Sequence, residues 1–416
     1  MKIRKYFTLQ ENRILEMIVA LLINLIIFST NNKLMIYTKH LFLVVIILCI
    51  TIFFVKREYL IRINKYKVLL FLFVLLIFIS YIWFDSNSFF LDYTLYFLAG
   101  VSIVFTNFSK EFYYYLIKIF KIIFWIFIFS MFLEALIPNI FRFILGFASF
   151  GDIEMRTLTS GGAIAGLAFE KAYAAFICNL GLGIFFAEFV TNKSYKGIIK
   201  NIVILLALMM TGKRTLFLIP IVVMLIFVII LSKNNRIIKL TGIGLGMVIV
   251  VVTAYTTIPE AALIIDRIFN NEGDVWSGRE NFWNYALEMF HQSPIFGKGF
   301  MSFNEYVFSR GFRYYGERWN YQAHNVYLQL LGEMGIIGFT LMVLLITSII
   351  IKAILFAKKE SNFWNMLLVY WIVLFGIYSL TGNTLYYPCQ MIILVLDIVF
   401  ISNIKKIKNV PYINLK

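Results

Sequence analysis

The chain is a succession of apolar stretches, most of them close to 20 residues long, separated by short polar or basic segments. A helix needs about 20 largely apolar residues to cross the hydrocarbon layer of a bilayer. Helices are the spanning structures that long continuous apolar runs allow, because every backbone group must find its partner within the segment. We therefore predict an all-α integral membrane protein with about 12 transmembrane helices. The expected spans cover residues 14–30, 38–55, 67–84, 90–107, 116–137, 163–190, 197–212, 215–232, 237–258, 333–356, 362–380 and 384–402.

Composition excludes an ordinary soluble domain. Apolar and aromatic residues make up 61% of the chain and charged residues only 14%, whereas a soluble protein carries roughly 25% charged residues. The net charge of +16 would suggest a nucleic-acid partner in a soluble protein. Here we attribute it to basic cytoplasmic loops and expect no nucleic acid. The three cysteines lie inside apolar runs and show no metal-ligand spacing.

The positions of Lys and Arg predict the topology. With the amino terminus inside, alternate connections are rich in basic residues, and those between them hold few or none. This is the pattern of the positive-inside rule. We expect a multi-pass membrane protein with both termini cytoplasmic and residues 1–416 forming a single polytopic domain.

One connection is far longer than those that join packed helices. Residues 259–323 form a large polar and aromatic loop before the tenth span, on the predicted outer face. A helix is expected at 281–291, followed by a turn at Pro294 and the glycines at 297 and 299. A second outer segment, 138–162, is expected to hold a short helix at 141–150. Long loops of this kind often carry function.

Three motifs occur in order over about sixty residues of this region. An Arg precedes a Trp-containing helix (277–283), a Pro-x-x-Gly-x-Gly turn follows (294–300), and His-Asn-x-Tyr-Leu leads into Glu-x-Gly-x-x-Gly (323–338). Together they resemble the carboxy-terminal region of the O-antigen ligase and Wzy-type polysaccharide polymerase superfamily. The resemblance implies a C-type glycosyltransferase-like fold in the bacterial cytoplasmic (inner) membrane, with its active face extracytoplasmic.

The family moves a glycan from an undecaprenyl-diphosphate carrier to a sugar hydroxyl, which defines the groups that are needed. Fixed cations stabilise the negative charge of a leaving diphosphate, and guanidinium groups match phosphate oxygens. A histidine is the obvious base for the hydroxyl proton. We therefore expect His324 as the base and Arg279 and Arg214 beside the diphosphate, with neither a metal nor another cofactor required.

Other residues are expected to bind substrate or to stabilise the fold. Each of the three catalytic candidates also has a structural interpretation: helix capping for His324, an interfacial arginine for Arg214 and a loop salt bridge for Arg279. Glu170 and Lys171 are interpreted as a structural pair in the sixth span, with acceptor binding as the alternative. Asp152 and Glu154 offer a rival divalent-cation site. The expected substrate-binding residues are Arg156, Lys213, Asn325, Arg313, Arg318 and Tyr321.

The leading functional hypothesis is a polymerase that extends an O-antigen, capsular or exopolysaccharide chain from lipid-linked repeat units. An O-antigen ligase, which moves the glycan to lipid A core, would show the same motifs. The Lys-, Ile- and Asn-rich composition gives no sign of the outer-membrane host that a ligase requires. A lipid-linked oligosaccharide flippase or a scaffold subunit is more distant, because the polar residues cluster on one predicted face. Expected partners are membrane lipid, a flippase and a chain-length regulator.

Overall fold

The computed structural model describes residues 2–30, 32–56, 63–83, 90–148, 163–168, 170–231, 279–312, 321–408 and 410, with five further residues between 252 and 262. Within these ranges the chain forms helices joined by turns and contains no strand, which confirms the all-α prediction. Among the residues that the structure describes, five helices are long and apolar enough to cross a membrane. The total of 12 spans stays a prediction, and the expected ninth span lies almost entirely outside the described residues.

Most predicted spans coincide with a helix. The first group is α1 (Lys2–Phe28), α2 (Asn32–Lys56), α3 (Lys65–Trp83), α4 (Phe90–Phe105), α5 (Lys110–Leu136) and the short α6 (Pro138–Ala148). The second group is α8 (Lys171–Asn192), α9 (Tyr195–Met210) and α10 (Arg214–Leu231). The third is α13 (Glu280–Gln292), α14 (Ser302–Ser309), α15 (Val326–Lys359), α16 (Phe363–Tyr378) and α17 (Pro388–Ile407).

Two boundaries differ from the prediction for local reasons. The expected span 163–190 becomes a helix only at Lys171, because the backbone of residues 165–167 donates to side chains of α5 and not to a helical ladder. The expected span 333–356 belongs to a helix that begins earlier, at Val326, and that is broken at Gly335. Hydropathy alone shows neither event, because the apolar character continues through both sites.

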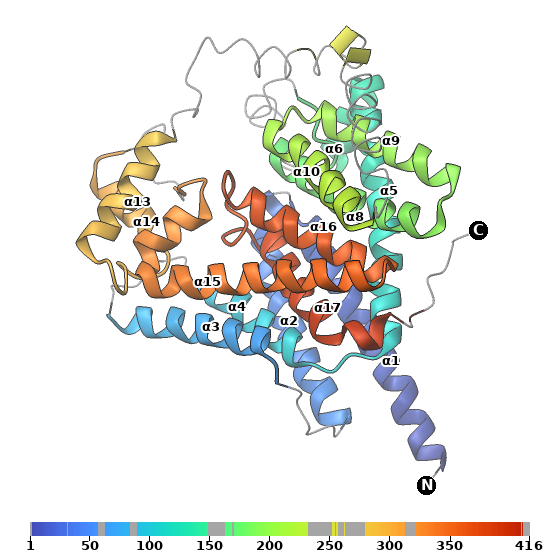
Figure 1. Ribbon diagram of the computed structural model, residues 1–416, viewed down its shortest axis with the longest axis horizontal. Helices are drawn as coiled ribbons and strands as arrows, with labels where there is room; N and C mark the ends of the chain where they lie inside the picture. The colour runs from blue at the N-terminus through green and yellow to red at the C-terminus, as the bar shows by residue number, and fades with distance from the viewer. Residues whose placement is uncertain are drawn as a thin grey trace.

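The centre of the bundle is formed by α16 and α17, with α8 packed against α16 (Figure 1). Almost every residue of α16 is buried, and 83% of the apolar window of α17 is buried inside the protein. The corresponding window of α2 is only 28% buried, so α2 exposes apolar side chains outward, as a lipid-facing helix does. The apolar residues in α16 and α17 therefore form a protein core.

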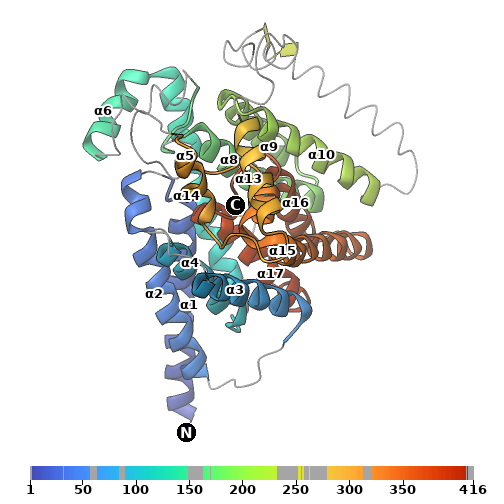
Figure 2. The ribbon, with the colours of Figure 1, turned by 90° about the vertical axis from the view of Figure 1, so that its left-hand side faces the viewer.

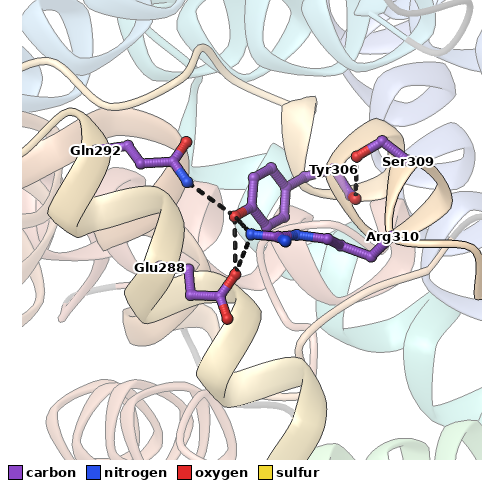
Figure 3. Close-up of polar contacts among 5 residues, drawn as sticks. All are labelled: Glu288, Gln292, Tyr306, Ser309 and Arg310. Carbon is purple, nitrogen blue, oxygen red and sulfur yellow. Dashed lines mark hydrogen bonds and ion pairs between the residues drawn. The ribbon is translucent and has the colours of Figure 1, made fainter.

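Helices α13 and α14 form a separate unit beside the start of α15 (Figure 1), and the perpendicular view places them in front of the bundle (Figure 2). Buried Ala286, Met289, Phe303 and Val307 make the small core of this unit. On its surface Glu288 of α13 accepts hydrogen bonds from Tyr306 and Arg310 of the α14 segment (Figure 3). The helix predicted at 281–291 is thus confirmed as α13, and the one predicted at 141–150 as α6.

Candidate functional site

The α13–α14 unit is joined to the bundle at the break in α15. At Gly335 the backbone leaves helical geometry (φ 59°, ψ −165°), which frees peptide groups on both sides of the break. The turn at 294–299 satisfies them: Pro294 O and Ile295 O accept from Ile336 N and Ile337 N at 2.9 and 3.4 Å. In return, Lys298 N and Gly299 N donate to Gly332 O and Glu333 O at 3.0 and 2.8 Å. Two motifs recognised separately in the sequence are therefore one structural joint.

Glycine is required in this joint because backbone lies against backbone. A Cβ atom at Gly335 would stand 2.3 Å from Ile295 O, and one at Gly297 would stand 2.3 Å from Glu333 O. Both residues also have positive φ, a region that costs other residues energy. The glycine spacing in the two motifs thus follows from a close approach of main chains.

Side chains of α13 and α15 fix the segment that carries His324. Trp283 of α13 donates its indole N–H to Ala323 O at 2.9 Å, and Ala323 N donates to Gln329 Oε1 at 2.9 Å. His324 itself has a φ of 52°, a left-handed conformation that is uncommon for a residue other than glycine and that is frequent at functional sites. Contacts on the preceding residue therefore hold the histidine in a conformation that the free chain would seldom adopt.

Asn325 completes the turn into α15 as its N-cap. Its side-chain oxygen accepts from Tyr327 N and Leu328 N, both at 3.1 Å, which satisfies two of the free N–H groups at the helix start. The next residue, Val326, donates its N–H to Ser379 O at 2.9 Å. Asn325 was expected to bind substrate, but the structure shows its Oδ1 engaged in capping.

The connection between α16 and α17, residues 379–387, receives both principal candidates. Asn383 Nδ2 lies 3.1 Å from His324 Nδ1. Arg279, the residue before α13, donates from Nη1 to Thr381 O at 3.1 Å. Because Thr381 and Asn383 are only two residues apart, Arg279 and His324 meet at the same short connection although 45 positions separate them in the sequence.

Two further charged residues, at the starts of α8 and α10, lie near Arg279 and His324. Lys213 precedes α10, and its Nζ lies 3.9 Å from Oε1 of Glu170, the residue before α8. The first turns of α8 also contact the same connection, because Tyr173 packs on Tyr387 with ring centroids 5.2 Å apart. The described site thus contains Arg279, Lys213, His324 and one carboxylate, brought together from four parts of the chain.

The electrostatics of the site keep the imidazole neutral. Burial, followed by the positive charges of Arg279 and Lys213, lowers the pKa of His324 to about 4. Burial also lowers the pKa of Lys213, an effect that the Glu170 carboxylate opposes and that Lys171 and Arg279 reinforce. The pKa of Arg279 is lowered by burial as well, against the opposing influence of Tyr378 and Glu170, and a guanidinium remains protonated at neutral pH. The arrangement offers two cations for an anionic group and a neutral imidazole for a proton.

The remaining predicted residues divide into three groups. Arg214 begins α10 with an exposed side chain, and among the described residues it makes no hydrogen bond or ion pair with this site. Tyr321 is buried: its ring packs against Phe282 and Phe312, with centroids 6.2 and 5.3 Å away, so it forms part of the core of the α13–α14 unit. Arg156, Arg313 and Arg318, and the rival metal pair Asp152 and Glu154, lie outside the described residues.

Sequence reasoning missed Thr381 and Asn383, and for Glu170 it favoured a structural pair over the alternative of acceptor binding. Glu170 was expected to pair with Lys171 inside a span, but it stands just before the helix and forms an ion pair with Lys213. Asn383 occurs in a short polar break, residues 381–384, between two apolar runs. That break was a usable signal, because a connection so short brings its polar side chains close to the helix ends on either side.

One comparison with known proteins identifies the region that carries the site. A family model described as O-antigen ligase matches residues 201–343. This segment is about a third of the chain and contains Lys213, Arg279, His324 and the joint at Gly335. No curated protein matches the chain at a significant level. The resemblance expected from the motifs is therefore confirmed over this region, and it supports an O-antigen ligase or polymerase type of role in a multi-pass membrane protein.

Proposed function

We propose that the protein is a polysaccharide polymerase that joins undecaprenyl-diphosphate-linked repeat units at the outer face of the bacterial cytoplasmic membrane. The observation that carries this proposal is the meeting of His324 and Arg279 at one connection of an apolar helical bundle, with Lys213 close enough for its charge to act on His324. The O-antigen ligase match over the same residues supports the same chemical class. Both termini are then cytoplasmic, and the α13–α14 unit is extracytoplasmic.

In the proposed reaction a sugar hydroxyl of the acceptor attacks the anomeric carbon of the donor. The bond from that carbon to the diphosphate oxygen breaks, and the diphosphate leaves with the electron pair. Arg279 and Lys213 stabilise the negative charge that develops on the leaving group. His324 accepts the hydroxyl proton as the new glycosidic bond forms. Cations supply the charge stabilisation, so the reaction as drawn needs no metal ion.

The donor itself adjusts the base. Burial and two positive charges hold the pKa of His324 at about 4, where the ring is a weak base. An incoming diphosphate neutralises Arg279 and Lys213 and adds negative charge beside the ring. Negative charge favours the imidazolium, so the pKa of His324 rises toward neutrality once the donor is bound. The base becomes effective only when there is a bond to cleave.

Asn383 determines which ring nitrogen receives the proton. An amide that donates to Nδ1 leaves the proton of the neutral ring on Nε2, where it blocks the base. Turned by half a rotation, Asn383 Oδ1 accepts from Nδ1–H, and Nε2 is free to accept the hydroxyl proton. In the described structure Asn383 Oδ1 is buried without a hydrogen-bond partner. The second orientation gives this oxygen one.

A ligase is the second candidate, and the description of the matching family favours it. The acceptor would then be lipid A core in place of a lipid-linked glycan. Expression in two bacterial hosts distinguishes these acceptors. One host lacks its own polymerase and makes lipid-linked repeat units; the other lacks its own ligase and accumulates finished lipid-linked chains.

A ladder of polymer lengths in the first host is the result expected for a polymerase, and the flippase and chain-length regulator of that host are the partners expected to supply and limit the reaction. Rescue of the second host alone would assign the protein as a ligase. If neither host produced a longer or transferred glycan at normal membrane levels of protein, glycosyl transfer would have to be abandoned as the function.

A further inference from the structure

The Glu170 carboxylate has no part in the reaction as drawn. A carboxylate near a diphosphate site weakens diphosphate binding by charge repulsion, so its presence beside Lys213 and Arg279 requires a different partner. Its charge acts on both cations, and its Oε1 is 3.9 Å from Lys213 Nζ. That distance is at the outer limit for an ion pair, and the side chain of Glu170 is 38% exposed.

Glu170 does not serve its own helix either. It occupies the N-cap position of α8 in an extended conformation (φ −128°, ψ 143°), but its side chain makes no capping hydrogen bond. Among the described residues its carboxylate oxygens accept no hydrogen bond, in contrast to Glu134, which accepts from Ala165 N and Gly166 N at 2.9 and 2.6 Å. Glu134 anchors the segment before α8, and Glu170 at the end of that segment retains free acceptor capacity.

The position of Glu170 is fixed by aromatic packing. Tyr173, one turn into α8, packs on Tyr387, and Phe176 packs on Tyr378 with ring centroids 5.8 Å apart. These contacts hold the start of α8 against the connection that binds Arg279 and His324. The carboxylate therefore stands at the edge of the site on the α8 side, whereas Arg279 enters from the start of α13.

We propose that Glu170 binds the acceptor sugar by accepting hydrogen bonds from its hydroxyl groups, which aligns the attacking hydroxyl with the donor. This inference rests on the proposed function. The diphosphate takes the two cations and the imidazole takes the proton, so a neutral hydroxylated ligand is the partner that remains suited to a carboxylate with open oxygens. Charge then sorts the two reacting ends: the cations bind the diphosphate of the donor, and the carboxylate binds the hydroxyl-bearing sugar of the acceptor.

The test compares Glu170→Gln with Lys213→Met, since each removes one side of the same ion pair. The full-length protein is placed in lipid nanodiscs. Transfer is measured from an undecaprenyl-diphosphate-linked repeat unit whose own acceptor hydroxyl is blocked, with the acceptor glycan varied at saturating donor. Binding of inorganic diphosphate is measured separately by calorimetry.

Glu170→Gln is expected to raise the KM for the acceptor roughly 10-fold, the loss of a charge-assisted hydrogen bond. Its kcat changes little, and its Kd for inorganic diphosphate stays equal or falls. Lys213→Met is expected to do the reverse, raising the Kd for diphosphate and leaving the acceptor KM unchanged. If the two variants changed the same constant, Glu170 would be only the counter-ion of Lys213 and the proposal would fail.

Glu170→Asp covers the case in which the Gln variant does not fold. It keeps the charge but shortens the reach by one methylene, so it is expected to raise the acceptor KM with an unchanged Kd for diphosphate. An unchanged acceptor KM in Glu170→Asp would overturn the assignment. Absence of transfer by the wild-type protein is a different result, because it would reject the proposed function and not this residue alone.

Discussion

Helices α1 to α5 and the joint between α13 and α15 are held together by different forces. The first region packs apolar side chains, such as Phe42 on Tyr96 and Phe28 on Phe120, and exposes others to its surroundings. The joint places backbone against backbone at Gly297 and Gly335. Apolar packing tolerates many residues of similar volume, whereas a main-chain contact admits only glycine. The joint therefore leaves a recognisable sequence motif, whereas the sequence of helices α1 to α5 shows only their hydropathy.

The largest effect is expected on catalytic activity, from a substitution in the second region. Arg279→Ala removes one of the two cations beside the proposed leaving group, and we expect kcat to fall roughly 100- to 1000-fold, as when other transition-state charge partners are removed. Arg310→Ala is the matched control: this arginine lies in the same unit, but its exposed side chain pairs with Glu288 on the surface (Figure 3). Glycan transfer in nanodiscs measures both. Equal losses in the two variants would mean that the effect comes from the fold of the unit.

The joint itself is tested by Gly335→Ala. The added Cβ would overlap Ile295 O, and φ is 59°, so we expect the free energy of unfolding to fall by about 3 kcal/mol. Gly311→Ala is the control because its φ is 82° with no atom within 4 Å of the new Cβ. It isolates the conformational cost, about 1 kcal/mol. Thermal unfolding followed by tryptophan fluorescence compares them, and a similar loss for both would remove the argument for a close backbone approach.

Asn383→Asp tests whether His324 is the group whose titration controls activity. The new carboxylate lies beside His324 Nδ1 and favours the imidazolium, so it raises the pKa of His324 above its value of about 4. Catalysis needs the neutral ring, so activity is lost as pH falls through this pKa. The acid limb of kcat/KM against pH is therefore expected to move to higher pH in the variant. An unmoved limb would show that His324 is not the group that titrates.

The smallest effect is expected in the first region. Phe54 of α2 is 66% exposed on the apolar outer surface, so Phe54→Leu should change neither the unfolding midpoint nor the rate of transfer measurably. A lipid-facing position asks only for an apolar side chain. A clear loss of stability in this variant would indicate that the outward face of α2 packs against another protein surface.

The same contrast explains how far sequence alone leads. Hydropathy predicts most helices because the cost of placing polar backbone in lipid dominates every other preference. It does not predict the start of α8 at Lys171 or the break at Gly335, because main-chain partners from elsewhere in the chain cause both. Motifs identify Arg279 and His324, which lie in the region of specific contacts. They do not identify Glu170 and Asn383, whose place follows only from the way the helices pack.

Lys213 and Arg214 show the limit most clearly. Both residues stand at a predicted helix start, and from the sequence we expected Arg214 as the catalytic cation and Lys213 as a binding residue. Adjacent residues at a helix start point in different directions, and the structure places Lys213 beside Glu170 while Arg214 is exposed. Which direction faces the site depends on the rotation of α10, and that rotation is set by its packing on α8 and α16. The catalytic role of Arg214 stays a prediction.

The central claim is that His324 takes the proton in a glycosyl transfer, and one comparison of purified proteins tests it most directly. Wild type, His324→Ala and His291→Ala are assayed in nanodiscs at pH 7 for glycan transfer and for release of undecaprenyl diphosphate. His291 is the matched control because it lies on α13 with an exposed side chain. We predict the wild-type rate of transfer for His291→Ala and a rate lower by roughly 100-fold or more for His324→Ala. Undiminished transfer by correctly folded His324→Ala would contradict the central claim.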